Sequence, residues 1–294
     1  MKPKVDFFIV GAPKCGTTAL AEILSQHPSV TISEPKEPHY FSSDLLTGGV
    51  MPESDEAYIQ RFFPENKSEG TLWGDASVWH MYSEVALQRI KEYNPNARII
   101  VVMRDPARAA FSLHQQMIFF QEEDERDFEK AWRLSDLRFA RKEYPVAMKL
   151  DPRLVAYRHA YNFYDQVVRL HVHFPAESIL MLRQEDFRKN FDKALREVTD
   201  FIGADPFEFD VRTVNETRYI KSAAFAALLR NRNVRRATKI LKTALNVKSF
   251  GVGRPSEIFR PEFAQLVHDD LSEEIAAMKR DFSVDLIAPS AGSK

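Results

Sequence analysis

The amino-acid sequence predicts an α/β fold, in which a doubly wound parallel sheet is flanked by helices within a single domain. Three short apolar runs rich in β-branched residues are typical of strands buried on both faces of such a sheet. They span Val5–Val10, Ile99–Met103 and Ser178–Leu182. Helical patterns alternate with these runs, as expected when helices connect parallel strands. The chain of 294 residues, 44% of them hydrophobic, is long enough to bury one large core.

The helices are predicted from apolar residues at helical spacing and from stop signals at their ends. The long, aromatic-rich helix ends at Phe174 and Pro175, and the helix after the third strand ends at Gly203. The expected helices are Thr18–Gln26, Ser83–Tyr93, Ala107–Phe119, Arg153–His173 and Phe187–Ile202. The domain is expected to cover residues 1–288, because the small and polar residues 289–294 are typical of a frayed tail.

Two charged stretches fit this scheme less well. Gln121–Asp136 is dense in charge, which is typical of a solvated helix. Arg230–Lys248 is basic with an apolar stripe and is expected to form a surface helix. A lid that faces an anionic acceptor or a membrane surface is the alternative for the basic segment.

Composition excludes several classes of protein. The formal net charge of −1 is unlike that of a general nucleic-acid binder, which needs a basic surplus. Cys15 is the single cysteine, so no intramolecular disulfide can form and a reducing cytoplasm is expected. No apolar stretch approaches the length of a membrane span, and the N-terminal apolar run is too short for a secretory leader. We therefore expect a soluble cytoplasmic protein, of an oligomeric state that the sequence does not indicate.

The first predicted strand runs directly into a glycine turn that opens a helix, over Val5–Ala19 (VDFFIVGAPKCGTTA). The amides at a helix start are unpaired and carry partial positive charge, so such a turn can bind an anion. P-loops for ATP read G-x-x-x-x-G-K-[ST]. Gly11 and Gly16 keep that spacing, but Thr17 occupies the lysine position and Lys14 lies two residues before Gly16. The turn therefore predicts a phosphate site that departs from the ATP-binding pattern.

The second predicted strand ends at Arg104, and Ser112 follows about two turns into the next helix. An arginine at the carboxyl end of a neighbouring strand points into the same crevice as the glycine turn. Its guanidinium offers a planar fork of donors to phosphate oxygens, which a nearby hydroxyl can share. A second phosphate site is the favoured interpretation. The alternative is a structural ion pair of Arg104 with Asp105 or Asp186.

The loop GAPKCGTTAL and the segment VVMRDPARAAFSL together resemble the two phosphate-binding motifs of sulfotransferases that use PAPS, 3′-phosphoadenosine 5′-phosphosulfate. Further motifs follow in the family's order: EPKEPHYF at Glu34–Phe41, GDASVWHM at Gly74–Met81, LRQEDF at Leu182–Phe187 and GVGRP at Gly251–Pro255. The likeness is closer to the carbohydrate-type branch, which includes heparan sulfate sulfotransferases and many bacterial relatives. It implies a P-loop-like fold and a bacterial cytoplasmic enzyme.

The resemblance also implies how the donor is held. The 5′-phosphosulfate would lie on the amides of the first loop, with Lys14 near the bridging oxygen. Negative charge grows on the departing phosphate, so an ammonium there stabilises the transition state more than the ground state. Arg104 and Ser112 would hold the 3′-phosphate, under a late loop in which Val252 replaces the family's usual lysine. The implied donor-binding residues are Lys14, Cys15, Gly16, Thr17, Thr18, Ala19, Arg104, Ser112, Gly253 and Arg254.

Sulfuryl transfer to a hydroxyl requires a base that removes its proton. The resemblance implies that Glu37 is this base and that His39 assists it, so Glu37, Lys14 and His39 form the catalytic set. On an extended segment the side chains of Glu37 and His39 would point the same way. From the residues alone, Glu37 beside Lys36 is a solvated acid and His39 is a packing residue. The reaction implied releases adenosine 3′,5′-bisphosphate, and no metal is expected.

Several side chains near these motifs have two interpretations. Asp75 carries the charge opposite to that of the lysine found in some relatives. Ser77 is either a donor to the sulfuryl group or a helix cap, and Trp79 is either a core residue or a platform for a sugar ring. The thiol of Cys15 is expected to have a lowered pKa, because it lies near a helix start and Lys14. Its expected role is nevertheless structural. His114–Gln116 face the acceptor or solvent.

The acceptor is the least defined part of the prediction. The resemblance favours a hydroxyl of a glycan, a glycosylated metabolite or another small molecule. Two other functions remain as alternatives: a P-loop-type small-molecule kinase that uses ATP, and a non-catalytic nucleotide-binding protein. A kinase requires the P-loop lysine directly after the second glycine, where this chain has Thr17.

Overall fold

The structure is a computed structural model, and it describes residues 4–45, 51–64, 67–146, 148, 150–210 and 258–287. Five strands form one sheet in the order β2-β3-β1-β4-β5, and every pair of neighbours is parallel. The strands are β1 (Phe7–Gly11), β2 (Val30–Ile32), β3 (Leu72–Asp75), β4 (Arg98–Met103) and β5 (Ile179–Arg183). The predicted α/β fold with a doubly wound parallel sheet is therefore confirmed.

The sequence did not predict β2 and β3. β2 has three residues and β3 has four, with Trp73 and Gly74 at the centre of β3. Runs this short carry no periodic pattern of their own. They are strands because β1 and β3 pair side by side and β2 adds to the edge of β3. Gly74 is required there, since a Cβ at this position would lie 2.3 Å from the ring of Phe7.

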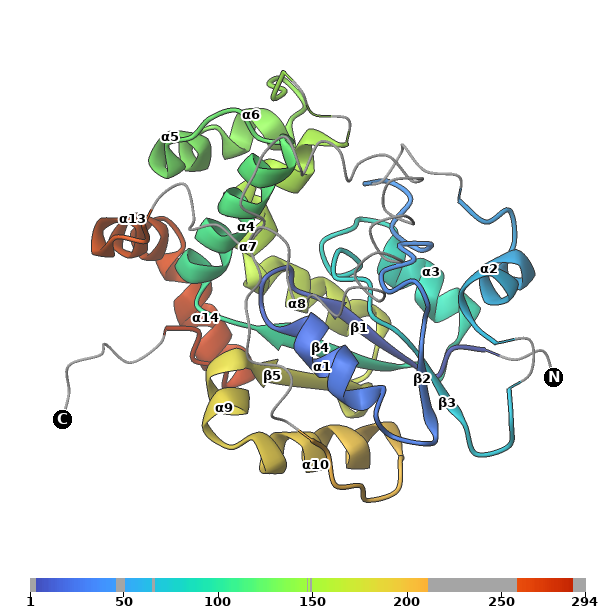
Figure 1. Ribbon diagram of the computed structural model, residues 1–294. Coiled ribbons are helices and arrows are strands. Elements are labelled where there is room, and N and C mark those ends of the chain that lie inside the picture. The colour runs from blue at the N-terminus through green and yellow to red at the C-terminus, as the bar shows by residue number, and fades with distance from the viewer. Residues whose placement is uncertain are drawn as a thin grey trace, which may run out of the picture.

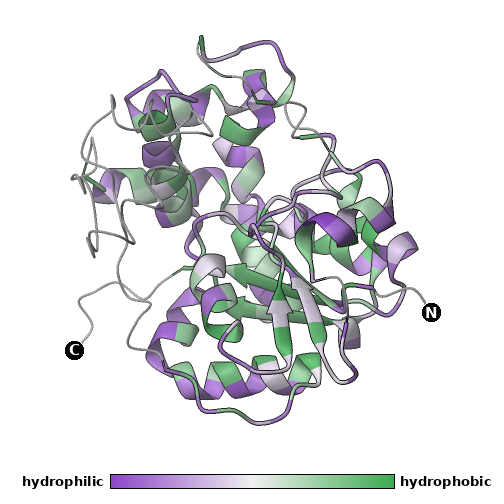
Figure 2. Ribbon diagram, turned by 45° about the vertical axis from the view of Figure 1, so that its right-hand side comes forward, coloured by the Kyte–Doolittle hydropathy of each residue, from purple (hydrophilic) through white to green (hydrophobic). Residues whose placement is uncertain are grey.

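Twelve α-helices surround the sheet in the described part of the chain. They are α1 (Thr17–Leu24), α2 (Asp55–Phe62), α3 (Ala86–Tyr93), α4 (Pro106–Phe120), α5 (Phe128–Arg133), α6 (Ser135–Phe139), α7 (Tyr157–Tyr161), α8 (Phe163–His173), α9 (Gln184–Lys189), α10 (Phe191–Ile202), α13 (Pro261–Asp270) and α14 (Ser272–Phe282). Figure 1 shows α1 in front of the sheet and α8 behind it. Figure 2 shows that hydrophobic residues concentrate in the strands and on the inner faces of the helices.

Two predicted helices are interrupted by asparagine. The helix expected over Arg153–His173 is a 3₁₀ turn followed by α7 and α8, and Asn162 caps α8 by accepting the amide of Asp165. The helix expected over Phe187–Ile202 divides into α9 and α10 at Asn190, which caps α10 in the same way. An asparagine side chain competes with the helix for backbone hydrogen bonds, which explains both breaks.

The acidic stretch Gln121–Asp136 is not the solvated helix that its charge predicts. It enters α5 through a loop in which Glu123 is 4% exposed. The guanidinium of Arg138 donates to both oxygens of Glu123, at 2.6 and 2.9 Å, and the hydroxyl of Tyr157 donates to it at 2.9 Å. A buried charge is stable when it is paired and hydrogen-bonded in this way. The stretch therefore anchors the helices beyond α4.

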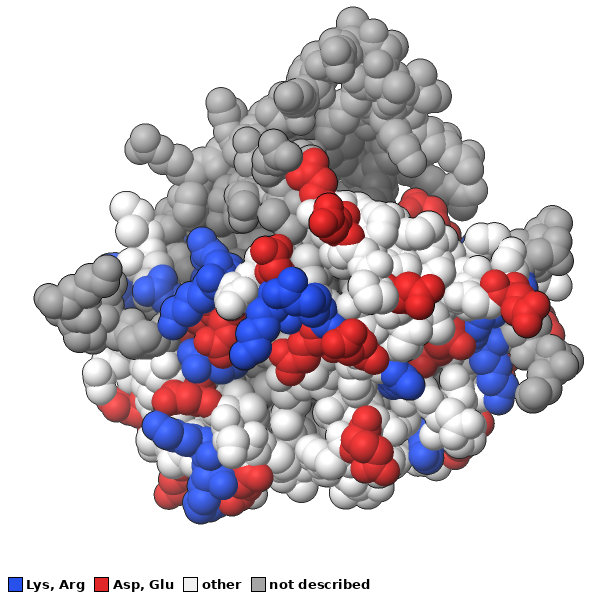
Figure 3. Space-filling view, turned by 90° about the horizontal axis from the view of Figure 1, so that it is seen from below, with Lys and Arg blue, Asp and Glu red and all other residues white. Residues whose placement is uncertain are grey.

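The remaining expectations concern segments outside the described residues, membrane-spanning helices and the surface charge. Arg230–Lys248, the loop Gly251–Pro255 and the tail 289–294 lie outside the described residues, so the domain boundary at residue 288 stays a prediction. None of the helices that the structure describes combines the length and the hydropathy needed to cross a membrane. On the described part of the face in Figure 3, basic and acidic side chains are interspersed.

Candidate active site

A cavity of about 540 Å³ lies at the carboxyl ends of the strands. Its walls come from the loop after β1 with the start of α1, from the middle of α4 after β4, and from α9 with the start of α10 after β5. The predicted site residues that line it are Lys14, Cys15, Gly16, Thr17, Thr18, Ala19, Glu37, Arg104 and Ser112. Gly253 and Arg254 lie outside the described residues. Segments far apart in the sequence thus meet at the sheet edge where ligands of doubly wound folds bind.

The loop after β1 leaves the first amides of α1 open to the cavity. Gly16 precedes the helix with φ of 97°, a left-handed conformation that favours glycine, and no side chain caps this helix. A Cβ at Gly16 would also lie 3.0 Å from the amide nitrogen of Gln184. The amide of Ala12 donates to the carbonyl of Val102 at 2.8 Å, which ties the loop to β4. The loop therefore presents uncapped helix amides to the cavity, an arrangement typical of anion-binding turns.

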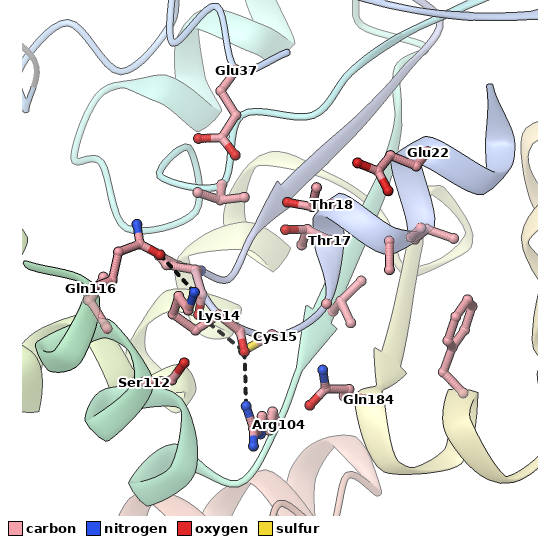
Figure 4. A pocket seen from close by; sticks show the side chains of 18 of the residues that line it. Lys14, Cys15, Thr17, Thr18, Glu22, Glu37, Arg104, Ser112, Gln116 and Gln184 are labelled. Atoms are coloured by element: carbon pink, nitrogen blue, oxygen red, sulfur yellow. Dashed lines mark hydrogen bonds between the residues drawn. The ribbon is translucent and has the colours of Figure 1, made fainter. Parts of the chain in front are cut away.

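Lys14 lines the cavity and has a neutral hydrogen-bond partner. Its Nζ donates to Oε1 of Gln116 on α4 at 2.7 Å. Burial lowers the pKa of Lys14, and the positive charge of Arg104 lowers it further, whereas Glu37 acts in the opposite direction. Figure 4 shows Lys14 between Glu37 on one side and Arg104 on the other. A partly desolvated ammonium without a carboxylate partner favours the binding of an anion.

Arg104 does not form the alternative ion pair with Asp105 or Asp186. Among the residues that the structure describes, no carboxylate lies within ion-pair distance of Arg104, and its Nη1 donates to the carbonyl of Lys14 at 3.3 Å. Asp105 instead caps α4 by accepting two amides of the first turn. Asp186 instead lies beside Arg183, the last residue of β5. The guanidinium and the Ser112 hydroxyl thus line the same cavity wall as a second potential anion site.

Cys15 does not have the lowered pKa that the sequence predicts. The thiol is fully buried and donates to the carbonyl of Pro13 at 3.4 Å. Burial raises its pKa and outweighs the nearby positive charges of Arg104 and Lys14. A neutral, buried thiol is a poor nucleophile. Cys15 is therefore a packing residue of the loop.

Glu37 and His39 do not lie on an extended segment, because their φ angles are 65° and 55°. The turn nevertheless brings Nε2 of His39 to 3.3 Å from Oε2 of Glu37, and Lys36 forms an ion pair with the other oxygen. Burial alone would raise the pKa of Glu37, but the contacts with His39 and Lys36 outweigh it and lower the pKa to about 2. Glu37 is therefore ionised at neutral pH and faces the cavity, whereas His39 is not among the residues that line it.

The residues with two interpretations are now placed. Ser77 is buried and does not line the cavity, and its hydroxyl donates to Asp75 at 2.6 Å. Trp79 is 7% exposed and forms part of the cavity wall, so it is both packed and accessible to a ligand. Gln116 faces the cavity, whereas His114 is buried, with Nε2 2.8 Å from the carbonyl of Glu125.

The cavity wall that follows β5 contains functional candidates that the sequence did not predict. This wall contains Gln184, Phe187, Arg188 and Phe191, of which Arg188 is exposed at the rim. The segment LRQEDF directly after the third predicted strand was the available signal. The carboxyl ends of all parallel strands lie at one edge of the sheet, and only β4 separates β5 from β1. Gln184 after β5 therefore reaches Gly16 in the loop after β1.

Comparisons with known proteins agree with this geometry. A family model for the sulfotransferase domain matches residues 4–250. The bifunctional heparan sulfate N-deacetylase/N-sulfotransferase 2 of Homo sapiens is 28% identical over 214 residues, 71% of this chain and 23% of that protein. Carbohydrate sulfotransferase 15 of Homo sapiens is 27% identical over 146 residues, 36% of this chain and 26% of that protein. The chain thus spans about a quarter of the length of these curated relatives.

A solved structure shares the fold over nearly the whole chain. The sulfotransferase from Alicyclobacillus acidocaldarius superposes with a TM-score of 0.69 at 22% sequence identity, covering 97% of this chain and 98% of that one. The family match, the P-loop-like fold and the resemblance of the motifs point in the same direction. The chain belongs to the sulfotransferase domain family.

Proposed function

We propose that the protein is a sulfotransferase that transfers the sulfuryl group of PAPS to an acceptor hydroxyl and releases adenosine 3′,5′-bisphosphate. The observation that carries the proposal is that one cavity contains two candidate anion-binding sites, each with a cationic side chain. One site is the loop of residues 14–19, and the other is Arg104 with Ser112. A donor with phosphate at both the 5′ and the 3′ position needs two such sites. An ATP kinase is not favoured, because Thr17 occupies the position of its lysine.

The residues fit this donor on grounds of their own chemistry. The first amides of α1 have no side-chain cap, and Arg104 has no carboxylate partner among the described residues. PAPS, when bound, supplies the sulfuryl group. The loop amides would hold its 5′-phosphate, while Arg104 and Ser112 would hold the 3′-phosphate. Lys14, now bonded to the neutral amide of Gln116, would be free to turn toward the leaving phosphate.

Three side chains of this protein would assist the transfer. The acceptor oxygen forms a bond to sulfur, the bond from sulfur to the bridging oxygen breaks, and that oxygen leaves with the bond's electron pair. Lys14 stabilises the negative charge on the leaving phosphate. Glu37 takes the acceptor proton, and His39 holds the carboxylate in place. Lys36 keeps Glu37 ionised but weakly basic, so an acceptor that displaces Lys36 would strengthen the base.

We propose a carbohydrate or a glycosylated small molecule as the acceptor. The names of the two relatives place heparan sulfate and carbohydrate among the substrates of this family's members. In this chain the indole of Trp79 lies in the cavity wall, where it can contact a sugar ring. A cytoplasmic location and a bacterial source stay predictions.

A screen with ³⁵S-labelled PAPS tests the function. Mono- and oligosaccharides, glycosides, phenols and lipids are offered as acceptors, and mass spectrometry follows the sulfate mass increment. We expect transfer to a sugar hydroxyl with release of adenosine 3′,5′-bisphosphate, and labelling by the Glu37→Gln variant that is lower by roughly 10²-fold to 10⁴-fold. Phosphorylation of an acceptor by ATP, without any turnover of PAPS, would overturn the proposal in favour of a kinase.

A further inference from the structure

The turn that carries Glu37 and His39 has a backbone that other parts of the molecule must hold in place. Both residues have positive φ although neither is glycine. Such left-handed conformations persist only where the surrounding structure determines them. The imidazole cannot hold the turn alone, because Nδ1 of His39 is buried without a hydrogen-bond partner among the described residues and only Nε2 reaches Glu37.

The backbone of His39 is held by Ser77, a residue of the GDASVWHM motif. The amide of His39 donates to Oγ of Ser77 at 2.9 Å, and Ser77 itself is fully buried. The carbonyl of His39 accepts the amide of Ser42 at 3.1 Å. The peptide groups on both sides of His39 are therefore fixed, one of them by a side chain far away in the sequence.

Asp75, the last residue of β3, determines which way the Ser77 hydroxyl points. Its carboxylate is fully buried and accepts hydrogen bonds from Ser77 and from the Tyr58 hydroxyl, both at 2.6 Å. An ionised carboxylate only accepts, so Ser77 must direct its proton to Asp75 and a lone pair to the amide of His39. Burial alone would raise the pKa of Asp75, but contacts with His80, Ser77 and Tyr58 outweigh it and lower the pKa.

We propose that Ser77, oriented by the buried carboxylate of Asp75, is a positioning residue that sets Glu37 in the cavity by fixing the backbone of His39. The hydrogen bonds run from Asp75 through Ser77 and His39 to Glu37. The acid at position 75, of opposite charge to the lysine of some relatives, thereby has a role of its own. This inference rests on the proposed function of Glu37.

The variant Ser77→Ala tests the proposal with Ser33→Ala as its matched control. Ser33 is a serine at the same edge of the sheet, directly after β2, and it is 2% exposed. Its hydroxyl has no hydrogen-bond partner among the described residues. Both substitutions remove one buried hydroxyl, but only Ser77→Ala releases the turn that holds the base.

We expect Ser77→Ala to lower kcat roughly 10-fold to 100-fold, because a shift of about 1 Å in a reacting group has effects of this order. The assay uses ³⁵S-PAPS with 4-methylumbelliferyl β-glucoside as a probe acceptor. The KM for PAPS and the affinity for adenosine 3′,5′-bisphosphate should stay unchanged, and Ser33→Ala should behave as the wild type. Unchanged kcat in Ser77→Ala, or equal losses in both variants, would overturn the proposal.

Amide hydrogen exchange followed by NMR separates this inference from the proposed function and needs no turnover. In the wild type the amide of His39 should exchange as slowly as the amides of β3, although it lies in a turn. Ser77→Ala should remove that protection, while Ser33→Ala should keep it. Exchange of the wild-type His39 amide at the rate of an unstructured peptide would disprove the positioning role, even if the protein proves to be a sulfotransferase or if Ser77→Ala fails to fold.

Discussion

The two sides of the cavity are built on different principles. The donor wall, which comprises residues 14–19, Arg104 and Ser112, is formed by the loop after β1, by the arginine directly after β4 and by a hydroxyl on α4. The base turn, residues 34–42, contains two non-glycine residues with positive φ and depends on buried side-chain hydrogen bonds. The sheet itself determines the donor wall, whereas the base turn depends on a few polar contacts.

The charges differ in the same way. On the donor wall, Lys14 has only a neutral amide as its side-chain partner and Arg104 has no carboxylate partner in the described part of the chain. On the other side, Glu37 is paired with Lys36 and His39. One wall is ready to receive an anion, and the other is electrically satisfied before a ligand binds. Substitutions in the donor wall should therefore affect nucleotide binding, whereas substitutions in the base turn should affect turnover alone.

The largest effect is expected from Glu37→Gln, which removes the base but keeps the shape of the side chain. Loss of a general base lowers the rate by roughly 10²-fold to 10⁴-fold. The affinity for adenosine 3′,5′-bisphosphate should be preserved, because the donor wall is untouched. Steady-state kinetics with PAPS and calorimetry with the bisphosphate measure the two quantities. A large loss of bisphosphate affinity would contradict the separation of the two walls.

Lys14→Ala should be nearly as damaging but should act on both quantities. Removal of one group that stabilises charge in the transition state costs about 10²-fold to 10³-fold in kcat. The same ammonium contributes to the donor wall, so we expect the bisphosphate affinity to fall as well. Lys14→Arg is the control, because it keeps the charge. If Lys14→Ala left bisphosphate affinity unchanged, Lys14 would not belong to the donor wall.

A smaller effect on binding is expected from Gln116→Glu. A carboxylate in place of the amide that accepts from Lys14 would neutralise the ammonium. Bisphosphate affinity should fall about tenfold, which corresponds to roughly the 1.5 kcal/mol of a charged hydrogen bond. Gln116→Ala is the matched control and should bind nearly as well as the wild type. Equal binding by the Glu and Ala variants would show that the neutrality of this partner is unimportant.

The smallest effect is a displacement of the pH profile. Burial and Arg104 lower the pKa of Lys14, so this lysine loses its proton at a lower pH than a lysine in water. As pH rises, kcat/KM should therefore begin to decrease at a pH below the usual pKa of lysine. Lys14→Arg should move this alkaline limb to higher pH. Glu37 should give no acid limb above pH 5, since its pKa is about 2. An alkaline limb that Lys14→Arg does not move would assign it to another group.

The meeting of the donor-wall residues in one cavity was predictable because their signals are local. The spacing of Gly11 and Gly16, the position of Lys14 and an arginine at the end of a strand are visible in short segments. Parallel strands bring their carboxyl ends together, so two such segments predict one crevice. The order of the motifs added the family resemblance, which the family match later confirmed.

The base turn was predictable only as a match of Glu37 and His39 to a motif. Its conformation was expected to be extended and is left-handed. The bond between Ser77 and His39, and that between Lys14 and Gln116, join residues 38 and 102 positions apart. Such contacts follow from the packed fold and leave no trace in local spacing. The same holds for the raised pKa of Cys15, which burial rather than neighbouring charge decides.

The central claim is that one cavity holds two phosphate groups of a single nucleotide, and calorimetry with adenosine 3′,5′-bisphosphate and 5′-AMP tests it most directly. The wild type should prefer the bisphosphate, and Arg104→Ala should remove the preference while binding of AMP stays unchanged. The expected loss is about 10-fold to 100-fold, the range for charged hydrogen bonds. Equal affinity of the wild type for both nucleotides, or a preference that survives Arg104→Ala, would contradict the account.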